Sequence, residues 1–399
     1  MMSKVKHVVC AMSGGVDSSV AALLMRKKGY NVTGLFMRNW DVLDETGECA
    51  ADRDCEDAQF VCQKLNIPFR EVNFVKEYWN NVFSDFLRQY QSGMTPNPDI
   101  LCNKHIKFDK FIQYAIEDLG ADALGTGHYA RTEPDILNFE NWKDHPQAKG
   151  IKLLKAIDTW KDQTFFLSQI TQEALHKTTF PLGELTKDVV KKIAEQAGLQ
   201  RIVKRKESMG ICFIGERNFN KFIKEYVEPQ PGQFVSIEDN KTIGQHEGHF
   251  LYTIGQRAKM GGLTQAWFVV DKNPNTNDVF VAPNSKHPAL YCESLVTGPV
   301  HWIHQPPRKL LQDQMMDCGF RFQHSDPLVD CTLTLSGMGS VIVSLSRPLR
   351  AITPGQYAVF YLGDECLGSG VIVKPGPSLY TLNWKKYQSG EWKPEFGAT

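Results

Sequence analysis

The chain has 399 residues, enough for two or three domains of ordinary size. Hydrophobic residues make up 42% and charged residues 23%, as in globular proteins, and no run approaches the roughly 18 apolar residues of a membrane-spanning helix. Lys and Arg number 45, as do Asp and Glu, so the net charge excludes a strongly basic protein, and nucleic-acid binding would need local patches.

The cysteines and the start of the chain limit the possibilities further. Ten cysteines occur without a secretory signal or a C-x-x-C pair, which argues against a disulfide scaffold and against zinc or iron–sulfur sites. The chain reaches its first predicted strand within a few residues, and we expect no room for a cleavable transit peptide ahead of it.

The most informative segment joins a predicted strand at residues 8–10 to a helix-forming run at residues 19–25. Gly14 and Gly15 allow a sharp turn there, and the positive end of the helix dipole would face an approaching anion. A Gly pair at such a turn is often purely structural. The complete string favours a phosphate site, made of Ala11, Met12, Ser13, Gly14, Gly15, Val16, Asp17 and Ser18.

The motifs that this turn lacks narrow the type of phosphate site. It has neither the G-x-x-x-x-G-K-[ST] loop nor the G-x-G-x-x-G fingerprint of dinucleotide binding. The string instead resembles the PP-loop of ATP pyrophosphatases, which attach AMP to an oxygen and release pyrophosphate. Asp17 would then suit a Mg²⁺ contact, because this cation prefers oxygen ligands and bridges phosphates, or it would cap the helix.

Alternating patterns over the first 130 or so residues predict a parallel sheet with helices on both faces. Further strands are expected at residues 32–37, 69–74 and 121–127, and helices at residues 55–65, 79–90 and 107–119. Ligands of such sheets bind at the carboxyl ends of the strands. Four segments should converge there: the glycine turn, Met37, residues 94–103, and the pair Gly127 and His128.

The rest of the chain predicts a change of architecture. Residues 132–150 read as a loop insertion, and Thr186 as the cap of a helix ending near Gly198. After about residue 228 short alternating runs predict one or two small β-barrels, with a weak break near residue 297. We therefore expect an α/β catalytic domain at 1–216, including a helical part at about 160–216, a β domain at 217–296 and a β-barrel at 297–399.

Two segments are strongly polarised in charge. Residues 41–57 carry eight acids and one base, and residues 187–206 carry seven bases and two acids. Either segment can be a solvated face, and the basic one can also contact a phosphate backbone.

Two cysteines stand in segments that favour chemistry. Two prolines stiffen the loop that presents Asn97, Asp99 and Cys102 ahead of a helix expected to begin near residue 103, and a thiol at a helix N-terminus ionises more easily. Cys212 follows the basic run between two glycines. Taken alone, each cysteine would more often be a buried structural residue, but the loop that holds Cys102 is expected to lie across from the glycine turn, which favours a reactive thiol there.

Together these segments resemble the tRNA-specific 2-thiouridylases, most closely the mitochondrial form, over nearly the whole chain. The resemblance rests on SGGVDSS (13–19), NPDILCN (97–103), GTGHYAR (125–131), KDQTFFLSQ (161–169), SMGICFIGER (208–217), GQHEGHFLYTIGQR (244–257) and RAITPGQYAVFY (350–361). The chain departs from many relatives in having Glu207, where Asp is usual, and Ser168, where a Cys is often seen.

The resemblance implies a reaction at uridine 34, the wobble base of certain tRNAs, among them those for Lys, Glu and Gln. ATP would adenylate O2, and sulfur carried by Cys212 as a persulfide would replace it. Cys102 would either attack C2 or cleave the persulfide, leaving a Cys102–Cys212 disulfide to be reduced. Asp99 would transfer a proton, and Asn97 would hold the base.

The resemblance also assigns binding residues. ATP would be bound by residues 11–18, by the backbone of Met37 and by Gly127. Contacts with the target base and the tRNA are implied for Asn97, Pro98, Asp99, His128, Lys161, Asp162, Gln163, Arg321, Phe322 and Gln356. The alternative for Phe322 is barrel core, and for Arg321 a surface charge.

Cofactors, partners and location follow from the same resemblance. It implies ATP, Mg²⁺ at Asp17, no zinc or iron–sulfur cluster, and no membrane. The partners would be the tRNA anticodon stem-loop and a persulfide donor such as a cysteine desulfurase relay or a rhodanese-like protein, in the mitochondrial matrix. From the residues alone, a PP-loop amidotransferase or ligase, and an RNA-binding module with a relict nucleotide site, remain as alternatives.

Overall fold

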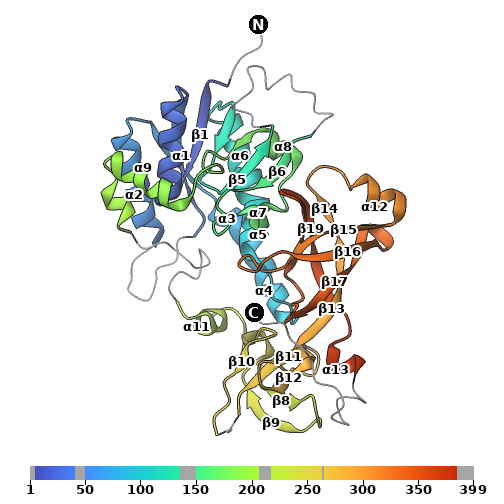
Figure 1. Cartoon of the computed structure of the whole chain (residues 1–399). Helices are drawn as coiled ribbons and strands as arrows, with labels where there is room; N and C mark the ends of the chain where they lie inside the picture. Colours follow the sequence, from blue (N-terminus) through green and yellow to red (C-terminus); the bar gives the residue numbers. More distant parts are fainter. Residues whose placement is uncertain (1–4, 41–49, 135–149, 206–216, 263–264, 384–399) are drawn as a thin grey trace.

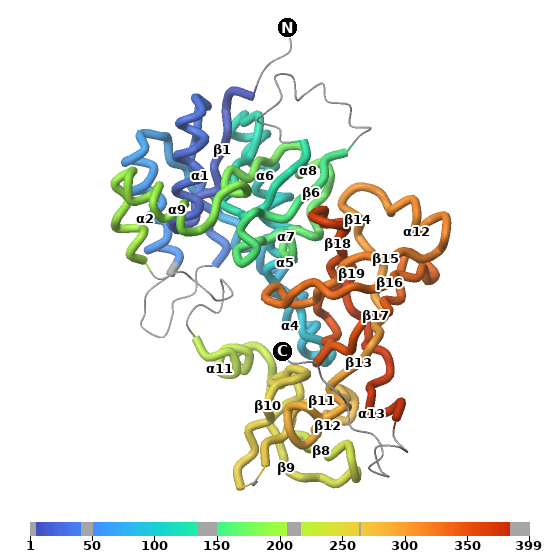
Figure 2. Tube along the Cα trace, in the orientation of Figure 1, coloured from blue at the N-terminus to red at the C-terminus, as the bar shows by residue number. Residues whose placement is uncertain are grey.

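The computed structural model describes residues 5–40, 50–134, 150–205, 217–262 and 265–383. An N-terminal α/β domain is followed by a small β domain and by a β-barrel that packs back against the first domain (Figures 1 and 2). The order of these three parts confirms the fold expected from the sequence.

The N-terminal domain is built on a five-stranded parallel sheet in the order β3-β2-β1-β4-β7. Val8, Val9 and Cys10 in the central strand are completely buried, as expected for a strand covered by helices on both faces. The chain continues on opposite sides of β1, to β2 and to β4, and ligands of such sheets bind at the carboxyl ends of the strands at this point. The strands are β1 (His7–Met12), β2 (Asn31–Arg38), β3 (Phe69–Asn73), β4 (Ala123–Gly125) and β7 (Thr178–Thr179).

Helices connect and cover these strands. In the first helix Val16, Val20 and Leu23 lie on the buried face, with the spacing of an amphipathic helix. The helices are α1 (Val16–Lys27), α2 (Ala50–Lys64), α3 (Val75–Tyr78), α4 (Ser84–Gln91), α5 (Pro98–Cys102), α6 (Ile112–Glu117), α7 (Thr164–Leu167), α8 (Gln172–His176), α9 (Lys187–Gln196) and α10 (Gln200–Val203), with the π-helical turns η1 (Trp79–Phe83) and η2 (Asn103–Phe111).

The expected loop insertion is bordered by a hairpin of β5 (Ala130–Glu133) and β6 (Lys152–Lys155). Residues 135–149 between them lie outside the described residues. The hairpin extends the sheet of the C-terminal barrel, because β6 pairs with β19 through Leu154 and Glu365. The hairpin that borders the expected loop is therefore a junction between two domains.

The middle domain is a five-stranded sheet in the order β10-β11-β12-β8-β9. Its small core contains Phe234, Val269, Val279 and Val281. The elements are α11 (Phe219–Lys224), which precedes the sheet, β8 (Gly232–Ser236), β9 (Thr242–His246), η6 (His249–Leu251), β10 (Arg257–Ala258), β11 (Trp267–Asn273) and β12 (Asp278–Pro283).

The C-terminal barrel contains a second hydrophobic core that includes Leu295, Phe320, Leu333 and Phe360. Its elements are η7 (Pro288–Leu290), β13 (Tyr291–Pro299), β14 (His301–Trp302), α12 (Arg308–Asp313), β15 (Met315–Arg321), β16 (Val329–Leu335), η8 (Gly337–Gly339), β17 (Ser340–Arg350), β18 (Tyr357–Leu362), β19 (Glu365–Pro375) and α13 (Leu379–Leu382). Strand β13 runs through residue 297, so we propose a domain division between 284 and 291 in place of 297.

Aromatic side chains of α11 and of the residues just after it pack against the N-terminal domain. The ring of Tyr226 lies 4.9 Å from that of Phe83, and the ring of Phe219 lies 5.2 Å from that of Tyr90. Helix α11 thus lies between the first and the middle domain (Figure 2). Within the described ranges, none of the helices combines the length and the apolar character that a membrane crossing requires.

Candidate active site

The glycine turn between β1 and α1 is a compact structure held by its own serines. The Ser18 hydroxyl donates to the Gly15 carbonyl (3.0 Å) and accepts from the Ser13 amide (3.1 Å). Ser19 also donates to the Gly15 carbonyl (2.8 Å). Because the first N–H groups of a helix have no partner within it, the turn presents donors and the positive end of α1 at the carboxyl edge of the sheet.

Two glycines of the predicted ATP site are required by close backbone packing. Gly14 has φ +73°, and a Cβ there would lie 2.4 Å from the Asp54 carbonyl oxygen at the start of α2. A Cβ at Gly127 would lie 2.7 Å from the Ser18 amide nitrogen. Met37 is half-buried near the end of β2, one residue beyond the Met12 pairing partner, and so lies at the same edge of the sheet.

Asp17 is held in place by two side chains from distant segments. The Lys187 ammonium, at the start of α9, lies 2.8 Å from each of its carboxylate oxygens, and the Tyr129 hydroxyl donates to one of them (2.9 Å). Lys187 is 8% exposed. The charge of Asp17 is therefore balanced by a buried cation beside the glycine turn.

This arrangement bears on the Mg²⁺ expected at Asp17. An ammonium already contacts both carboxylate oxygens, so Asp17 as placed does not fit a metal ligand. Among the described residues, no group of three or more His, Cys, Asp or Glu side chains is arranged to hold a metal ion. We therefore assign no step to Mg²⁺.

The loop that precedes Cys102 differs from expectation in where its helix begins. Helix α5 starts at Pro98, five residues earlier than expected, and Asn97 caps it by accepting from the Ile100 amide (3.2 Å). Pro98 occupies the first helical position, where its missing N–H costs nothing. Cys102 consequently lies inside a continuous helical stretch and is 4% exposed, so the expectation of a thiol ahead of a helix N-terminus is wrong.

Burial and the charge of Lys107 shift the pKa values of Asp99, in α5, and of His128, after β4. Burial raises the pKa of Asp99, and the nearby charge of Lys107 opposes that shift. Burial, assisted by Lys107, lowers the pKa of His128 well below its ordinary value, so its imidazole is neutral at pH 7. His128 Nδ1 lies 3.0 Å from the Thr126 hydroxyl. Lys107 thus affects the pKa of both Asp99 and His128. The ring of Phe108, next to Lys107 on η2, lies 5.7 Å from the ring of His128, so the turn that continues α5 packs beside the residue that follows Gly127.

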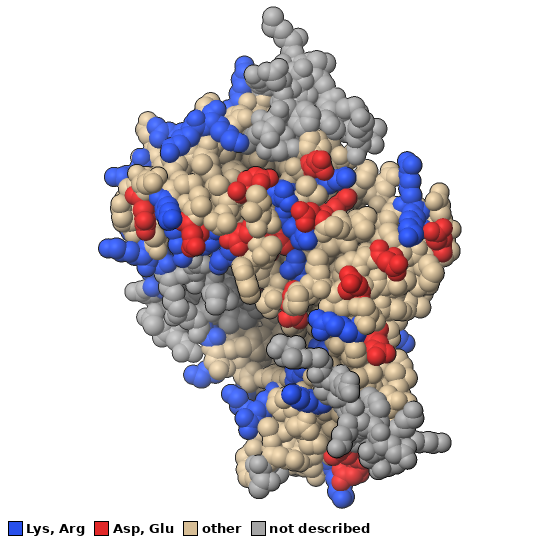
Figure 3. All heavy atoms as spheres, viewed as in Figure 1, with Lys and Arg blue, Asp and Glu red and all other residues tan. Residues whose placement is uncertain are grey.

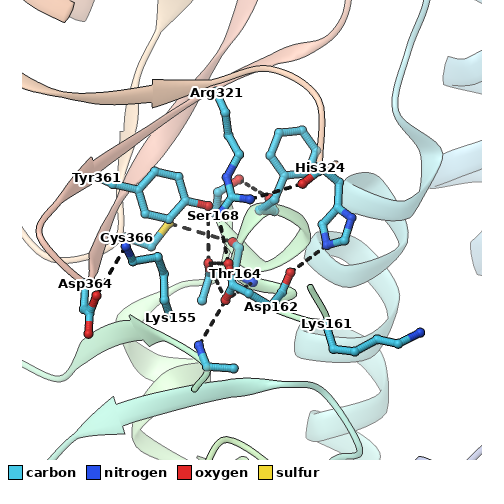
Figure 4. Close-up of polar contacts among 12 residues, drawn as sticks. Lys155, Lys161, Asp162, Thr164, Ser168, Arg321, His324, Tyr361, Asp364 and Cys366 are labelled. Carbon is cyan, nitrogen blue, oxygen red and sulfur yellow. Dashed lines mark hydrogen bonds and ion pairs between the residues drawn. The ribbon is translucent and has the colours of Figure 1, made fainter. Parts of the chain in front are cut away.

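A buried ion pair joins the barrel to the N-terminal domain (Figure 4). Arg321 of β15 donates to Asp162 (2.8 Å), and Asp162, which is 1% exposed, also accepts from the Thr164 hydroxyl and the Ala156 amide. The Arg321 guanidinium lies 4.9 Å from the centre of the Tyr361 ring. Two residues expected to contact tRNA are therefore bonded to each other inside the protein.

The other predicted tRNA contacts near this pair differ in their surroundings. Phe322 is 2% exposed and stacks on Phe320 in the barrel core, the alternative that the sequence left open. Gln163 accepts from the Tyr129 amide (2.9 Å) and so connects the Asp162 segment to the residue that holds Asp17. Lys161 points away from the buried pair (Figure 4).

The two polarised segments partly neutralise each other. Arg201 pairs with Asp57 (2.7 Å), and Arg205 pairs with Asp57 (2.7 Å) and with Asp54. On the face shown in Figure 3, Lys and Arg side chains gather over the part of the N-terminal domain that holds α1, α2 and α9, with acidic side chains among them. Part of the basic run is therefore paired with acidic side chains of the same domain.

Cys212 lies outside the described residues, which stop at Arg205 and resume at Arg217. Arg205 is held by Asp54, whose carbonyl faces Gly14, so the chain leaves the described part beside the glycine turn. Arg217 lies over the Phe222 ring (4.6 Å) on α11.

Three residues of this site were not singled out from the sequence: Lys187, Tyr129 and Lys107. Lys187 follows the predicted helix cap Thr186, so the sequence predicted its position at the start of a helix. The sequence did not predict its partner Asp17, which lies 170 residues away. Tyr129 stood inside the GTGHYAR motif without an assigned role.

Family models match the chain in three consecutive parts. They are described as the tRNA methyl transferase HUP domain (residues 6–216), the tRNA methyl transferase PRC-barrel domain (220–283) and the aminomethyltransferase β-barrel domain (292–372). These assignments agree with the parallel sheet and the two β domains of the structure.

Curated relatives match over almost their whole length. Mitochondrial tRNA-specific 2-thiouridylase 1 of Gallus gallus is 58% identical over 402 residues, which covers 96% of this chain and 95% of the relative. The Homo sapiens protein of the same name is 56% identical, with coverages of 98% and 95%. The tRNA-specific 2-thiouridylase MnmA of Pectobacterium carotovorum is 45% identical, with coverages of 92% and 97%. The chain therefore belongs to the tRNA-specific 2-thiouridylase family.

Proposed function

We propose that this protein is an ATP-dependent tRNA sulfurtransferase that converts uridine 34 to 2-thiouridine. The proposal rests on the family and on one structural observation. Gly127 packs against the first turn of α1, and the ring of His128, the next residue, lies 5.7 Å from the ring of Phe108 on η2, which continues the helix bearing Asp99 and Cys102. A nucleotide at the turn and a base at the α5 loop would then share one pocket.

In the first half-reaction, O2 of the uridine attacks the α-phosphorus of ATP and pyrophosphate leaves. The donors of residues 11–18 would hold the phosphates, and the Met37 backbone would contact the adenine. Lys187 and Tyr129 fix Asp17 at the helix start, which keeps the turn in shape for this step. The adenylated oxygen becomes a good leaving group, as AMP, for an attack on C2.

In the second half-reaction, sulfur carried as a persulfide on Cys212 replaces that oxygen. In one route Cys102 attacks Sγ of Cys212 and displaces the outer persulfide sulfur as sulfide, which adds to C2 as AMP departs. In the other, Cys102 attacks C2 and displaces AMP, the outer sulfur of the Cys212 persulfide then displaces Cys102 from C2, and Cys102 attacks Cys212 Sγ to free the 2-thiouridine. Both routes leave a Cys102–Cys212 disulfide, and a thiol must then reduce it.

Asp99 would transfer the proton, because its raised pKa lets its carboxyl act nearer neutral pH than an exposed one. The neutral imidazole of His128 would contact the base or the adjoining nucleotide without adding charge. Asn97 and Pro98 would border the base, which must leave its stack to reach them.

The partners and location follow the relatives. Anticodon stem-loops, including those of the tRNAs for Lys, Glu and Gln, would lie against Lys161, Gln163 and the barrel near Gln356, whereas Arg321 and Phe322 are buried and would not contact the RNA directly. Because most similar relatives carry the mitochondrial name, we place the reaction in the mitochondrial matrix. A cysteine desulfurase relay or a rhodanese-like protein would supply the persulfide.

The test is a reaction of purified protein with ATP, a persulfide source and unmodified tRNA, followed by mass spectrometry of the nucleosides. We expect 2-thiouridine at position 34, with one AMP per modified tRNA. Cys102→Ser and Cys212→Ser should abolish the product, and Cys292→Ser, a buried barrel cysteine, should retain it. ATP–pyrophosphate exchange with a small acid and no tRNA would instead favour a ligase and contradict the proposal.

A further inference from the structure

A loop of the barrel contacts the segment that precedes α5. The Pro354 carbonyl accepts from the Thr95 amide (2.9 Å), and Gly355 approaches so closely that a Cβ there would lie 2.8 Å from the Thr95 nitrogen. Gly355 also has φ +93°, a conformation that side chains other than glycine rarely adopt. At this point the two domains are therefore in contact through their backbone atoms.

The next residue, Gln356, bonds to three successive residues of the loop. Its Nε2 donates to the carbonyls of Thr95 (2.9 Å) and Pro96 (3.2 Å), and its Oε1 accepts from Asn97 Nδ2 (3.3 Å). The backbone of Gln356 is itself fixed, because its carbonyl accepts from the Ile372 amide (2.7 Å) on β19. The side-chain amide of Gln356 thus holds residues 95–97 in a fixed position relative to the barrel.

The loop at residues 95–98 needs hydrogen bonds from other segments to keep its conformation. Pro96 and Pro98 have no N–H group, so the segment cannot hold itself through a regular pattern of backbone hydrogen bonds. Asn97 fixes the start of α5 by capping the Ile100 amide, and Gln356 fixes the other end of the Asn97 side chain. Asp99 and Cys102 lie on that same helix.

We propose that Gln356 is a positioning residue that holds the loop and helix bearing Asp99 and Cys102 before any RNA arrives. The proposal rests on the function proposed above only in that it gives those two residues their chemical roles. It makes the barrel a structural part of the catalytic site, in addition to any surface that it offers to tRNA.

The resemblance gives Gln356 a different role, as a contact of the tRNA. The two roles separate when no RNA is present. A residue that only touches RNA leaves the free protein unchanged, whereas a positioning residue controls how often the loop opens. Cys102 reports on such opening, because it is 4% exposed and an alkylating reagent reaches it only when the loop moves.

The experiment measures the rate of Cys102 alkylation by iodoacetamide in the full-length protein without tRNA or ATP, by mass spectrometry of its peptide. Gln356→Ala removes all three bonds. Gln356→Glu keeps the acceptor for Asn97 but points a carboxylate at two carbonyls. We expect both variants to raise the rate by about fivefold or more, since one lost hydrogen bond of ordinary net strength corresponds to about that factor.

Gln172→Ala is the matched control. Gln172 bridges the backbone of Ile151 by bonds of 2.7 and 2.8 Å, away from the α5 loop, so its loss should lower thermal stability without changing Cys102 alkylation. Rates within twofold of wild type in both Gln356 variants, or an equal rise in the control, would overturn the proposal. Because no tRNA enters the assay, this result is independent of whether the protein forms 2-thiouridine.

Discussion

The Lys187 ammonium lies 2.8 Å from both carboxylate oxygens of Asp17, across 170 residues of chain. This contact ties the start of α9 to the first turn of α1, where the nucleotide phosphates are expected. A buried cation at this position balances the acid without a metal, and Tyr129 adds a hydrogen bond from a third segment.

Replacing Lys187 by Met should impair the ATP-dependent step. Asp17 would lose its main partner and the glycine turn its fixed shape, and a misplaced site of this kind costs roughly ten- to a hundredfold in rate. We expect the rate of tRNA-dependent AMP release to fall by that factor and Lys187→Arg to recover part of it. Lys192→Met, an exposed position on the same helix, is the control, and an equal loss there would contradict the assignment.

Breaking the pair between Arg321 and Asp162 should destabilise the whole protein. Arg321→Met leaves the Asp162 carboxylate buried without its cation, which typically costs about 3–5 kcal/mol. The double variant Arg321→Met with Asp162→Asn should recover much of the loss, because no unpaired charge remains. Urea unfolding of the four proteins of this cycle measures the coupling. If the two single losses simply add, the ion pair is not what joins the domains.

The ionisation of Asp99 should lower the free energy of unfolding as the pH rises. Its pKa in the folded protein is raised by burial, so between the ordinary value of 3.8 and the folded value the native state binds more protons than the unfolded chain. The free energy of unfolding therefore falls through this window. Asp99→Asn should match wild type near pH 4 and become the more stable protein toward neutral pH, while losing thiolation activity.

Denaturant titrations of both proteins between pH 4 and 8 follow this difference. Asp109→Asn, at an exposed position of η2, controls for the loss of a surface charge. A constant gap between Asp99→Asn and wild type across this range would show that burial of the carboxyl does not set its ionisation.

The sequence predicted the parts of this protein that depend on local pattern. The apolar run at residues 8–10, the glycine turn and the following helix appear as expected, because burial and glycine conformation are read from neighbouring residues. The start of α5 was missed for a local reason. Asn97 and Pro98 form a cap and a first helical position, but the pair of prolines was read as loop.

The long-range contacts could not be predicted. The hairpin of β5 and β6 is stabilised by β19, more than 200 residues later, and the Arg321–Asp162 pair joins segments 159 residues apart. Charge counts over residues 41–57 and 187–206 indicated two polarised segments, yet only the fold shows that Arg205 pairs with Asp54 and Asp57. Such pairs are set by domain packing, which a single sequence does not encode locally.

The central claim is that ATP activates the oxygen that sulfur then replaces. Uridine 34 labelled with ¹⁸O at O2, placed in an anticodon stem-loop, tests this claim in a single turnover with ATP and the persulfidated protein. We predict that each 2-thiouridine formed is matched by one AMP carrying a single ¹⁸O atom in its phosphate. Label released into water or pyrophosphate, with unlabelled AMP, would contradict the account.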